Sequence, residues 1–274
     1  MDGDTRVGPR TDRPHAARMY DYLLGGRDHY AADGEAAERA LAIFPKLRTA
    51  AEENRAFLGR AVRYLVRKAG IRQFIDLGSG MPTALNVHQI AQGIEPRSRV
   101  LYVDNDPIVL AFGGAMLAQD ERTAVVRCDI RRPRDILEHP RTAALLDLAR
   151  PIGVLAVAVL HFIDDEHDPE GVVRAFRDVA APGSHFVLSH AASDLLPETA
   201  RSLQAAYRAH GVPLTIRDRA RFEGFFDGLE LVEPGIDMVS EWRPTAPADE
   251  RPPREDVCWF GGVGRVVVPG GAGA

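Results

Sequence analysis

The chain has 274 residues, a formal net charge of -5 and a sequence pI of about 6.0. That length suits one α/β domain with a sizeable core, and the acidic balance argues against a general nucleic-acid binder, which would carry a basic surface. The two cysteines, Cys128 and Cys258, both lie in apolar runs, so we expect neither a disulfide framework nor a metal cluster. With no apolar run near the roughly 18 residues that span a bilayer and no signal-peptide core at the polar start, we expect a cytoplasmic protein without membrane contact.

The chain is predicted to begin with helices. Residues 1–14 are rich in Asp, Gly, Arg, Thr and Pro, and we expect a disordered tail there. The predicted helices cover residues 15–26, 31–44 and 48–69. The third has the clearest pattern, with Ala51, Leu58 and Leu65 at helical spacing. Residues 15–70 are therefore expected to form a helical cap ahead of the first strand.

Residues 71–268 alternate short apolar runs with helical segments, which predicts a mostly parallel sheet of seven strands. The predicted strands are residues 73–77, 99–104, 123–128, 152–157, 185–189, 229–236 and a segment within 256–268. The predicted helices of this part are 83–92, 107–118, 134–137, 141–148, 171–179, 198–210 and 217–226. The almost unbroken apolar character of 152–157 predicts a central strand that is buried on both faces. Residues 269–274 are expected to be a frayed tail.

The most informative segment is residues 76–83, Asp-Leu-Gly-Ser-Gly-Met-Pro-Thr, where the first strand runs into a glycine-rich turn. Gly78 and Gly80 lack Cβ atoms, so the backbone can bend sharply there and approach a ligand closely. A dinucleotide fingerprint would have a third glycine where Thr83 stands. The turn therefore favours a nucleoside without a pyrophosphate.

Acidic residues follow the next two strands. Asp104 and Asp106 end the second apolar run, and Asp129 follows the third. Open α/β sheets bind ligands at the carboxyl ends of their strands, so these acids are expected to lie at one ligand-binding edge.

These residues resemble the motifs of class I S-adenosylmethionine-dependent methyltransferases, and the resemblance implies a Rossmann-like fold with S-adenosyl-L-methionine as cofactor. It implies that the glycine turn wraps the methionine part, that Asp104 holds the ribose hydroxyls, and that Asp129 meets the adenine amino group. Ile130 would pack on the adenine ring. The full set of expected cofactor-binding residues is Tyr20, Tyr22, Asp76, Gly78, Ser79, Gly80, Thr83, Asp104, Asn105, Asp129, Ile130, Ala156, Val157 and Ala158.

More narrowly, the chain resembles an S-adenosyl methyltransferase family found mainly in high-GC Gram-positive bacteria, over about residues 15–268. The marks of this resemblance are the runs at residues 18–26, 54–58, 102–107 and 188–191. In class I methyltransferases the N-terminal section covers the cofactor. Residues 18–58 are therefore expected to form a lid.

The expected reaction is an in-line displacement from a sulfonium, in which the protein mainly aligns the acceptor and excludes water. A base is needed only if the acceptor enters protonated. His161, in a Val-Leu-His-Phe run that resembles the segment after the fourth strand of many small-molecule methyltransferases, is the first candidate, and His190 is the second. The alternative for each is a histidine that packs or hydrogen-bonds within the fold. Asn54 and Arg55 are expected on a solvated helix face or in a local ion pair and not in contact with the cofactor, and no metal site is expected.

The acceptor is not specified by the sequence. After the fourth strand, Ala156-Val157-Ala158 replaces the Asn/Asp-Pro-Pro-Tyr motif that holds a planar amino nitrogen, so a small, partly apolar molecule is expected, and not a nucleic acid. Its site is expected to be lined by Phe162, Tyr20, Tyr22 and Leu195. Two alternatives remain open: a nicotinamide-dependent oxidoreductase, disfavoured by the missing glycine and the lack of a Tyr-x-x-x-Lys pair, and a regulatory protein that binds the cofactor without turnover. The oligomeric state is also left open.

Overall fold

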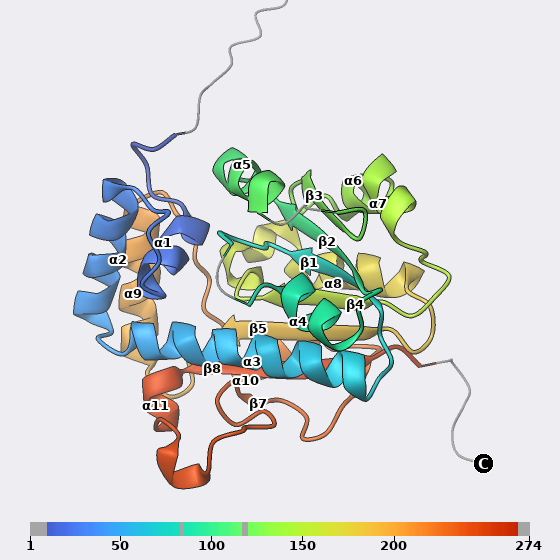
Figure 1. Ribbon diagram of the computed structural model, residues 1–274. Helices are drawn as coiled ribbons and strands as arrows, with labels where there is room; N and C mark the ends of the chain where they lie inside the picture. Colours follow the sequence, from blue (N-terminus) through green and yellow to red (C-terminus); the bar gives the residue numbers. More distant parts are fainter. Residues whose placement is uncertain (1–9, 83–84, 117–119, 268–274) are drawn as a thin grey trace, which may run out of the picture.

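One twisted sheet organises the molecule, with helices packed on both of its faces (Figure 1). The computed structural model describes residues 10–82, 85–116 and 120–267. Within these ranges the strands are β1 (Gln73–Leu77), β2 (Arg99–Asp104), β3 (Thr123–Arg127), β4 (Gly153–Val157), β5 (His185–Ala191), β6 (Glu230–Leu231), β7 (Asp237–Met238) and β8 (Trp259–Arg265). Their order is β3-β2-β1-β4-β5-β8-β6, and β7 also pairs with β8. Strands β1 to β5 are parallel, whereas β8 runs antiparallel to β5.

Apart from the short α11, which the sequence does not predict, the α-helices fall on the predicted segments with shifts of their ends. The α-helices are α1 (Ala16–Leu23), α2 (Ala31–Ile43), α3 (Leu47–Arg67), α4 (Val87–Ile94), α5 (Pro107–Met116), α6 (Pro133–Leu137), α7 (Pro140–Leu145), α8 (Pro169–Val179), α9 (Pro197–Ala209), α10 (Arg219–Gly224) and α11 (Arg254–Val257). Three short 3-10 turns, η1 (Leu160–Phe162), η2 (Asp165–His167) and η3 (Ala248–Glu250), complete the described elements.

Alternate residues of each central strand supply two separate cores. In β1, Phe74 belongs to the core under α1, α2, α3 and α4, whereas Ile75 belongs to the core on the opposite face, under α6, α7 and α8. This follows from the two-residue period of a strand, whose side chains point to opposite faces. All five residues of β1 are buried. In β4, for which the sequence predicts burial on both faces, Gly153 to Ala156 are buried and Val157 is half-buried.

Of the expected strand 229–236, only Glu230–Leu231 forms a strand, β6, and an unpredicted strand, β7, follows it, so the sheet has eight strands in the described residues, one more than the sequence predicts. Residues 233–234 form a turn between them. Pro234 has no N–H to donate to a ladder, which ends the pairing with β8. The first crossover helix also begins later than residue 83, at Val87, and the Gln89 side chain accepts the backbone N–H of Asn86 at 2.8 Å.

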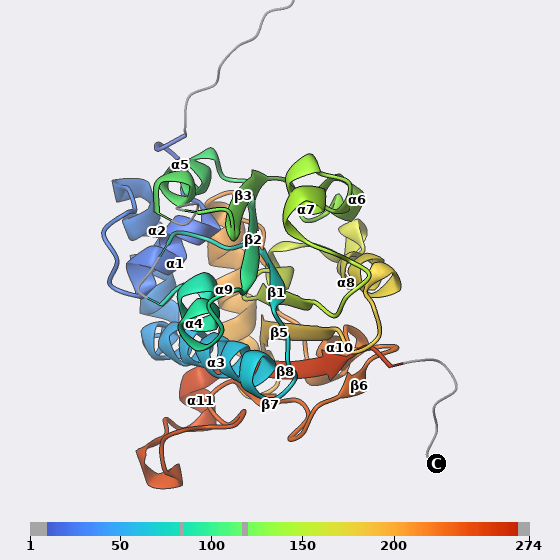
Figure 2. The ribbon, with the colours of Figure 1, turned by 45° about the vertical axis from the view of Figure 1, so that its right-hand side comes forward.

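The N-terminal helices are continuous with the main core. Helix α3 runs along one face of the sheet beside α4, and α1 and α2 stack at the strand-end edge, next to α9 (Figures 1 and 2). Of the expected disordered tail, residues 1–9 lie outside the described part. Residues 10–14 contact α1: the carbonyls of Arg10 and Arg13 accept hydrogen bonds from the Arg18 guanidinium at 3.2 and 2.7 Å.

Candidate active site

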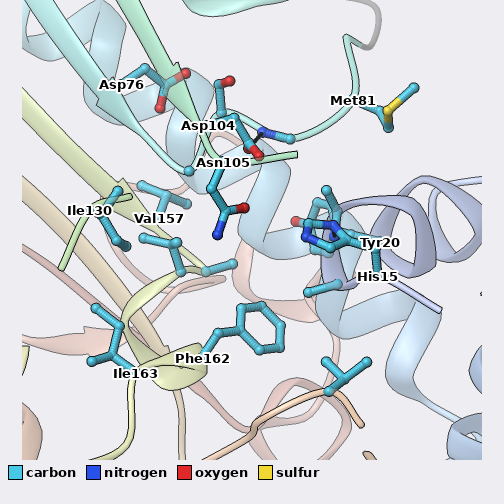
Figure 3. Close-up of a pocket in the computed structure, with 18 of the residues that line it drawn as sticks. His15, Tyr20, Asp76, Met81, Asp104, Asn105, Ile130, Val157, Phe162 and Ile163 are labelled. Atoms are coloured by element: carbon cyan, nitrogen blue, oxygen red, sulfur yellow. Dashed lines mark hydrogen bonds between the residues drawn. The ribbon is translucent and has the colours of Figure 1, made fainter. Parts of the chain in front are cut away.

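A cavity of about 270 Å³ lies at the carboxyl ends of β1, β2 and β4, below α1 (Figure 3). It contains most of the residues that the sequence singles out. Those that line it are Tyr20, Asp76, Gly78, Ser79, Gly80, Asp104, Asn105, Asp129, Ile130, Val157 and Ala158. Open parallel sheets concentrate strand-end side chains at this edge, which explains why segments far apart in the sequence meet here.

The glycine turn forms the floor of the cavity beside β1. Gly78 has a φ of +67°, and a Cβ there would lie 2.3 Å from Cγ2 of Val159, so only glycine fits. A Cβ on Gly80, which has a φ of +65°, would lie 3.9 Å from Cβ of Ala17 on α1, an ordinary contact, so there is room beside this backbone. Between them, the buried Ser79 hydroxyl has no hydrogen-bond partner among the described residues. A ligand that approaches this backbone would supply the missing partner.

Two backbone N–H groups fix the carboxylate of Asp104 at the end of β2. Its Oδ1 accepts the N–H of Asp106 and its Oδ2 accepts the N–H of Gly80, both at 2.9 Å. Burial raises the pKa of this carboxyl, and these two hydrogen bonds oppose the rise. Because each carboxylate oxygen has a further lone pair, Asp104 can still accept from two hydroxyl groups in the cavity.

Opposite charges line the β1 side of the cavity. Burial raises the pKa of Asp76 to about 7, the positive charge of Arg55 lowers it, and Asp104 raises it further. Arg55 projects from α3, and its Nη2 donates to the Leu85 carbonyl at 3.2 Å. A carboxyl and a guanidinium at one end of the cavity match the ammonium and carboxylate groups of an amino acid.

Asp129, after β3, is less free than the sequence predicts. It lines the cavity, but Arg131 covers it: the Arg131 Nε donates to Oδ1 at 2.9 Å and to Oδ2 at 3.0 Å. The same side chain lowers the pKa of Asp129. A ligand amino group would therefore share this carboxylate with Arg131. Ile130 stands beside it on the cavity wall (Figure 3).

A series of hydrogen bonds connects Tyr20 on α1 with Ala158 at the end of β4. Ser189 Oγ on β5 accepts the N–H of Ala158 at 3.0 Å and donates to Asn54 Oδ1 at 2.6 Å. Asn54 Nδ2 donates to the Tyr20 hydroxyl at 2.9 Å, which in turn donates to the Ala51 carbonyl at 3.0 Å. Burial raises the pKa of Tyr20 to about 12, so this hydroxyl stays protonated.

The hydrogen bond between Ala158 and Ser189 constrains the backbone at the end of β4. The φ of Ala158 is +57°, a left-handed conformation that is rare for a residue with a side chain and is kept only where the surroundings enforce it. The bond to Ser189 holds the Ala158 N–H in that conformation, at the point where β4 ends in the cavity.

A second anchor fixes α1 over the cavity. The Arg18 side chain is 3% exposed, and it binds Asp33 and Asp106 through Nε and Nη1, both at 2.8 Å. Asp106 also lies 3.2 Å from His15 Nδ1, and His15 lines the cavity. Helix α1 is thus tied to α2 and to the end of β2 by one buried guanidinium.

Neither expected catalytic histidine lines this cavity. His190 is fully buried, with Nδ1 2.7 Å from the Ala191 carbonyl and Nε2 3.0 Å from Arg217 Nη1, so both ring nitrogens are used within the fold. Burial lowers its pKa to about 3. His161 lies behind Phe162, where burial, followed by His190 and Arg217, lowers its pKa well below the usual range. Both imidazoles are therefore neutral, and His190 has no free nitrogen to act as a base.

Other expected site residues lie elsewhere. Tyr22 faces outward, where its hydroxyl binds Glu38 and the Arg48 guanidinium stacks on its ring at 4.9 Å. Ala156 is buried within β4 outside the cavity lining, Leu195 is 42% exposed, and Thr83 lies outside the described residues.

The sequence also misses several lining residues. Asn54 and Arg55 line the cavity although a solvated helix face was expected for them, and Asn54 is only 1% exposed. Their place in the run 54–58 was a usable signal. Met81, within the glycine-rich turn, also lines the cavity, as do His15, Ile163 and residues 211–213, which come from segments without a chemical pattern.

This arrangement defines a class of protein: an open α/β fold with a cavity at its strand ends, lined by Asp104, Asp76 and Arg55. The chain matches the S-adenosyl methyltransferase family over residues 5–267. It belongs to that family and is an S-adenosylmethionine-dependent methyltransferase. The expected family, fold class, enzyme activity and cofactor are thereby confirmed, and the oxidoreductase and non-catalytic alternatives are set aside.

Solved structures agree. A DUF574 family protein from Streptomyces avermitilis is 41% identical, with a TM-score of 0.91 over 94% of this chain and 99% of that one. A candidate methyltransferase from Thermobifida fusca is 39% identical, with a TM-score of 0.90 over 96% and 100% of the two chains. An O-methyltransferase family protein from Burkholderia thailandensis, 11% identical, shares the fold alone, with a TM-score of 0.52 over 91% of this chain and 64% of that one. The comparison with curated proteins found no match.

Proposed function

We propose that the cavity of about 270 Å³ binds S-adenosylmethionine and that the chain transfers its methyl group to a small, partly apolar molecule. The observation that carries this proposal is Asp104, whose two oxygens are fixed by backbone N–H groups and keep lone pairs for the two ribose hydroxyls. The unpartnered Ser79 hydroxyl and the room beside Gly80 also fit a ligand that lies along this turn.

The remaining contacts follow from the positions of the residues around Asp104. Asp129 and Ile130 would receive the adenine, because they follow β3, the strand next to β2. Asp76 and Arg55 would bind the ammonium and carboxylate of the methionine part, on the β1 side. Tyr20 would cover the ligand from α1, since Asn54 and Ala51 hold its hydroxyl in place.

The chain's part in the chemistry is alignment and the exclusion of water. S-adenosylmethionine supplies a methyl group on a sulfonium, and that leaving group needs no proton. The walls beyond β4, formed by Val157, Ala158 and Phe162, would orient the acceptor toward the methyl. The absence of a charged base among these three residues favours an acceptor whose attacking atom already has a free lone pair.

We further propose that nucleic acid is not the acceptor and that the protein acts in the cytoplasm. The net charge of -5 opposes binding to a phosphate backbone. No helix in the described part of the chain has the length and apolar character needed to cross a membrane.

Calorimetry with S-adenosylhomocysteine, the product form of the cofactor, tests the proposed site. Wild-type protein should bind it with one site per chain, and Asp104→Ala should weaken binding. Equal affinity in a folded Asp104→Ala variant would remove the ribose assignment.

A further inference from the structure

A second, smaller space adjoins the cavity behind Phe162. This side chamber has a volume of about 40 Å³ and shares Ala16, Tyr20 and Phe162 with the main cavity. Its far wall is formed by Leu203 and Tyr207 of α9, with Trp259 of β8. One water needs about 10–15 Å³ of such space, so the chamber accommodates only a compact group.

The walls of the side chamber carry no charged side chain. Aromatic rings dominate: Tyr20 stacks with Trp259 at 6.2 Å between ring centroids, and Phe162 stacks with Tyr207 at 6.5 Å. His161 completes the set, 4.4 Å from Phe162. Because an isolated charge is expensive to bury in such surroundings, the chamber selects against ionised groups.

Two side chains of the chamber each have a polar atom that is not used within the fold. His161 Nδ1 accepts the Ala191 N–H at 3.4 Å, which assigns the imidazole proton to Nε2. Within the described residues, neither that Nε2 nor the Tyr207 hydroxyl has a hydrogen-bond partner, although Tyr207 as a residue is only 8% exposed and His161 3%. A ligand in the chamber would supply such a partner.

We infer that the acceptor carries a compact, uncharged apolar end bearing a hydroxyl or carbonyl oxygen, and that this end enters the side chamber. There the oxygen pairs with His161 Nε2 or with the Tyr207 hydroxyl. The inference rests on the proposed function, since the shared walls Tyr20 and Phe162 place the chamber beside the expected methyl site. His161 thereby acts as a hydrogen-bond donor that selects the acceptor.

Two isosteric probes test this inference, propionamide and propionate, which differ in charge but hardly in size. Saturation-transfer NMR on wild-type protein filled with S-adenosylhomocysteine should detect propionamide and not propionate. Leu203 lines the chamber but not the main cavity, so the variant Leu203→Phe fills the chamber from α9 and should lose the propionamide signal. Leu231→Phe, at a 43% exposed position on β6, is the matched control and should keep it.

A more conservative substitution tests the same chamber in case the ring introduced by Leu203→Phe disturbs the packing. Tyr207→Phe removes only the hydroxyl and should weaken the propionamide signal, whereas Tyr22→Phe, outside both cavities, should not.

Equal signals for both probes on wild type, no signal for either, or full propionamide binding in a Leu203→Phe protein of wild-type melting temperature would each overturn the inference. Failure of wild-type protein to bind S-adenosylhomocysteine would instead count against the proposed function.

Discussion

At the scale of single residues, the site combines buried acids with different tasks. Asp104 is fixed by two backbone donors, Asp106 by Arg18, and Asp129 by Arg131. The sequence predicts their positions, because each follows an apolar run. It cannot predict which of them Arg131 covers, since a side-chain contact between residues 129 and 131 depends on rotamers that no pattern encodes.

We expect Asp104→Ala to weaken S-adenosylhomocysteine binding by about 1.5–3 kcal/mol, the scale of hydrogen bonds to a charged group. Isothermal titration calorimetry measures this directly. Asp249→Ala, at an exposed position, is the matched control and should bind as wild type does.

Asp76 is expected to make stability depend on pH. Its pKa in the folded chain is about 7, whereas an unfolded Asp titrates near 3.9. The folded chain therefore keeps a proton that the unfolded chain releases between these values, and the stabilisation is full below about pH 4 and lost as the pH rises to about 7.

The variant Asp76→Asn should remove this loss. Urea unfolding at pH 5 and at pH 8 should show the variant gaining on wild type as the pH rises, by at most about 1.4 kcal/mol per pH unit within the window. If the free energy of unfolding changed equally in the two proteins between pH 5 and pH 8, that result would contradict the raised pKa of Asp76.

At the scale of elements, the hydrogen-bond chain through Tyr20, Asn54 and Ser189 joins α1, α3 and β5 to the end of β4. The sequence predicts these elements and marks three of the runs that meet here. It does not predict that they meet, because periodicity reports local structure and not contacts between distant segments. The same limit explains His190: its place at a strand end suggests chemistry, but Arg217, which binds it, comes from a segment without a motif.

Ser189→Ala should leave the Ala158 N–H and the Asn54 side chain without a partner. We expect a loss of about 1–3 kcal/mol in the free energy of unfolding, together with a lower kcat at unchanged S-adenosylhomocysteine affinity. Ser202→Ala on the exposed face of α9 is the control.

A double-mutant cycle distinguishes the loss of this hydrogen-bond chain from independent destabilisation by each substitution. The double variant Ser189→Ala/Asn54→Ala should lose less stability than the sum of the two single variants, because both act on one chain of hydrogen bonds. Strict additivity would show that Ser189 and Asn54 act independently.

At the scale of the whole molecule, the N-terminal helices α1 and α3 line the cavity that we propose to hold the cofactor. The mostly parallel sheet, the edge where its acids gather and the N-terminal helices are predictable, since strand-end acids and helical periodicity are strong signals, whereas the strand order is not encoded in any such pattern. How firmly the N-terminal helices are attached to the sheet cannot be predicted from the sequence, because the attachment depends on the buried Arg18 and its ion pairs with Asp33 and Asp106.

Truncating the N-terminal segment tests how far S-adenosylhomocysteine binding depends on this attachment. Deleting residues 1–9 should leave S-adenosylhomocysteine affinity unchanged, whereas deleting residues 1–30 should abolish binding, because it removes Arg18 and Tyr20. Arg18→Met is a milder version, and it should destabilise the protein by about 3–5 kcal/mol by leaving buried carboxylates unpaired. Equal affinity in both truncations would refute the lid.

The central claim is that this chain methylates a small, partly apolar molecule in the cavity beside Asp104. The most direct measurement is to incubate the protein with methyl-labelled S-adenosylmethionine and a metabolite extract, and to identify labelled products by mass, with Asp104→Ala in parallel. We predict label in a small molecule with wild-type protein and little with the variant. Label only in RNA or protein, or no label from wild-type protein that binds S-adenosylhomocysteine, would contradict the claim.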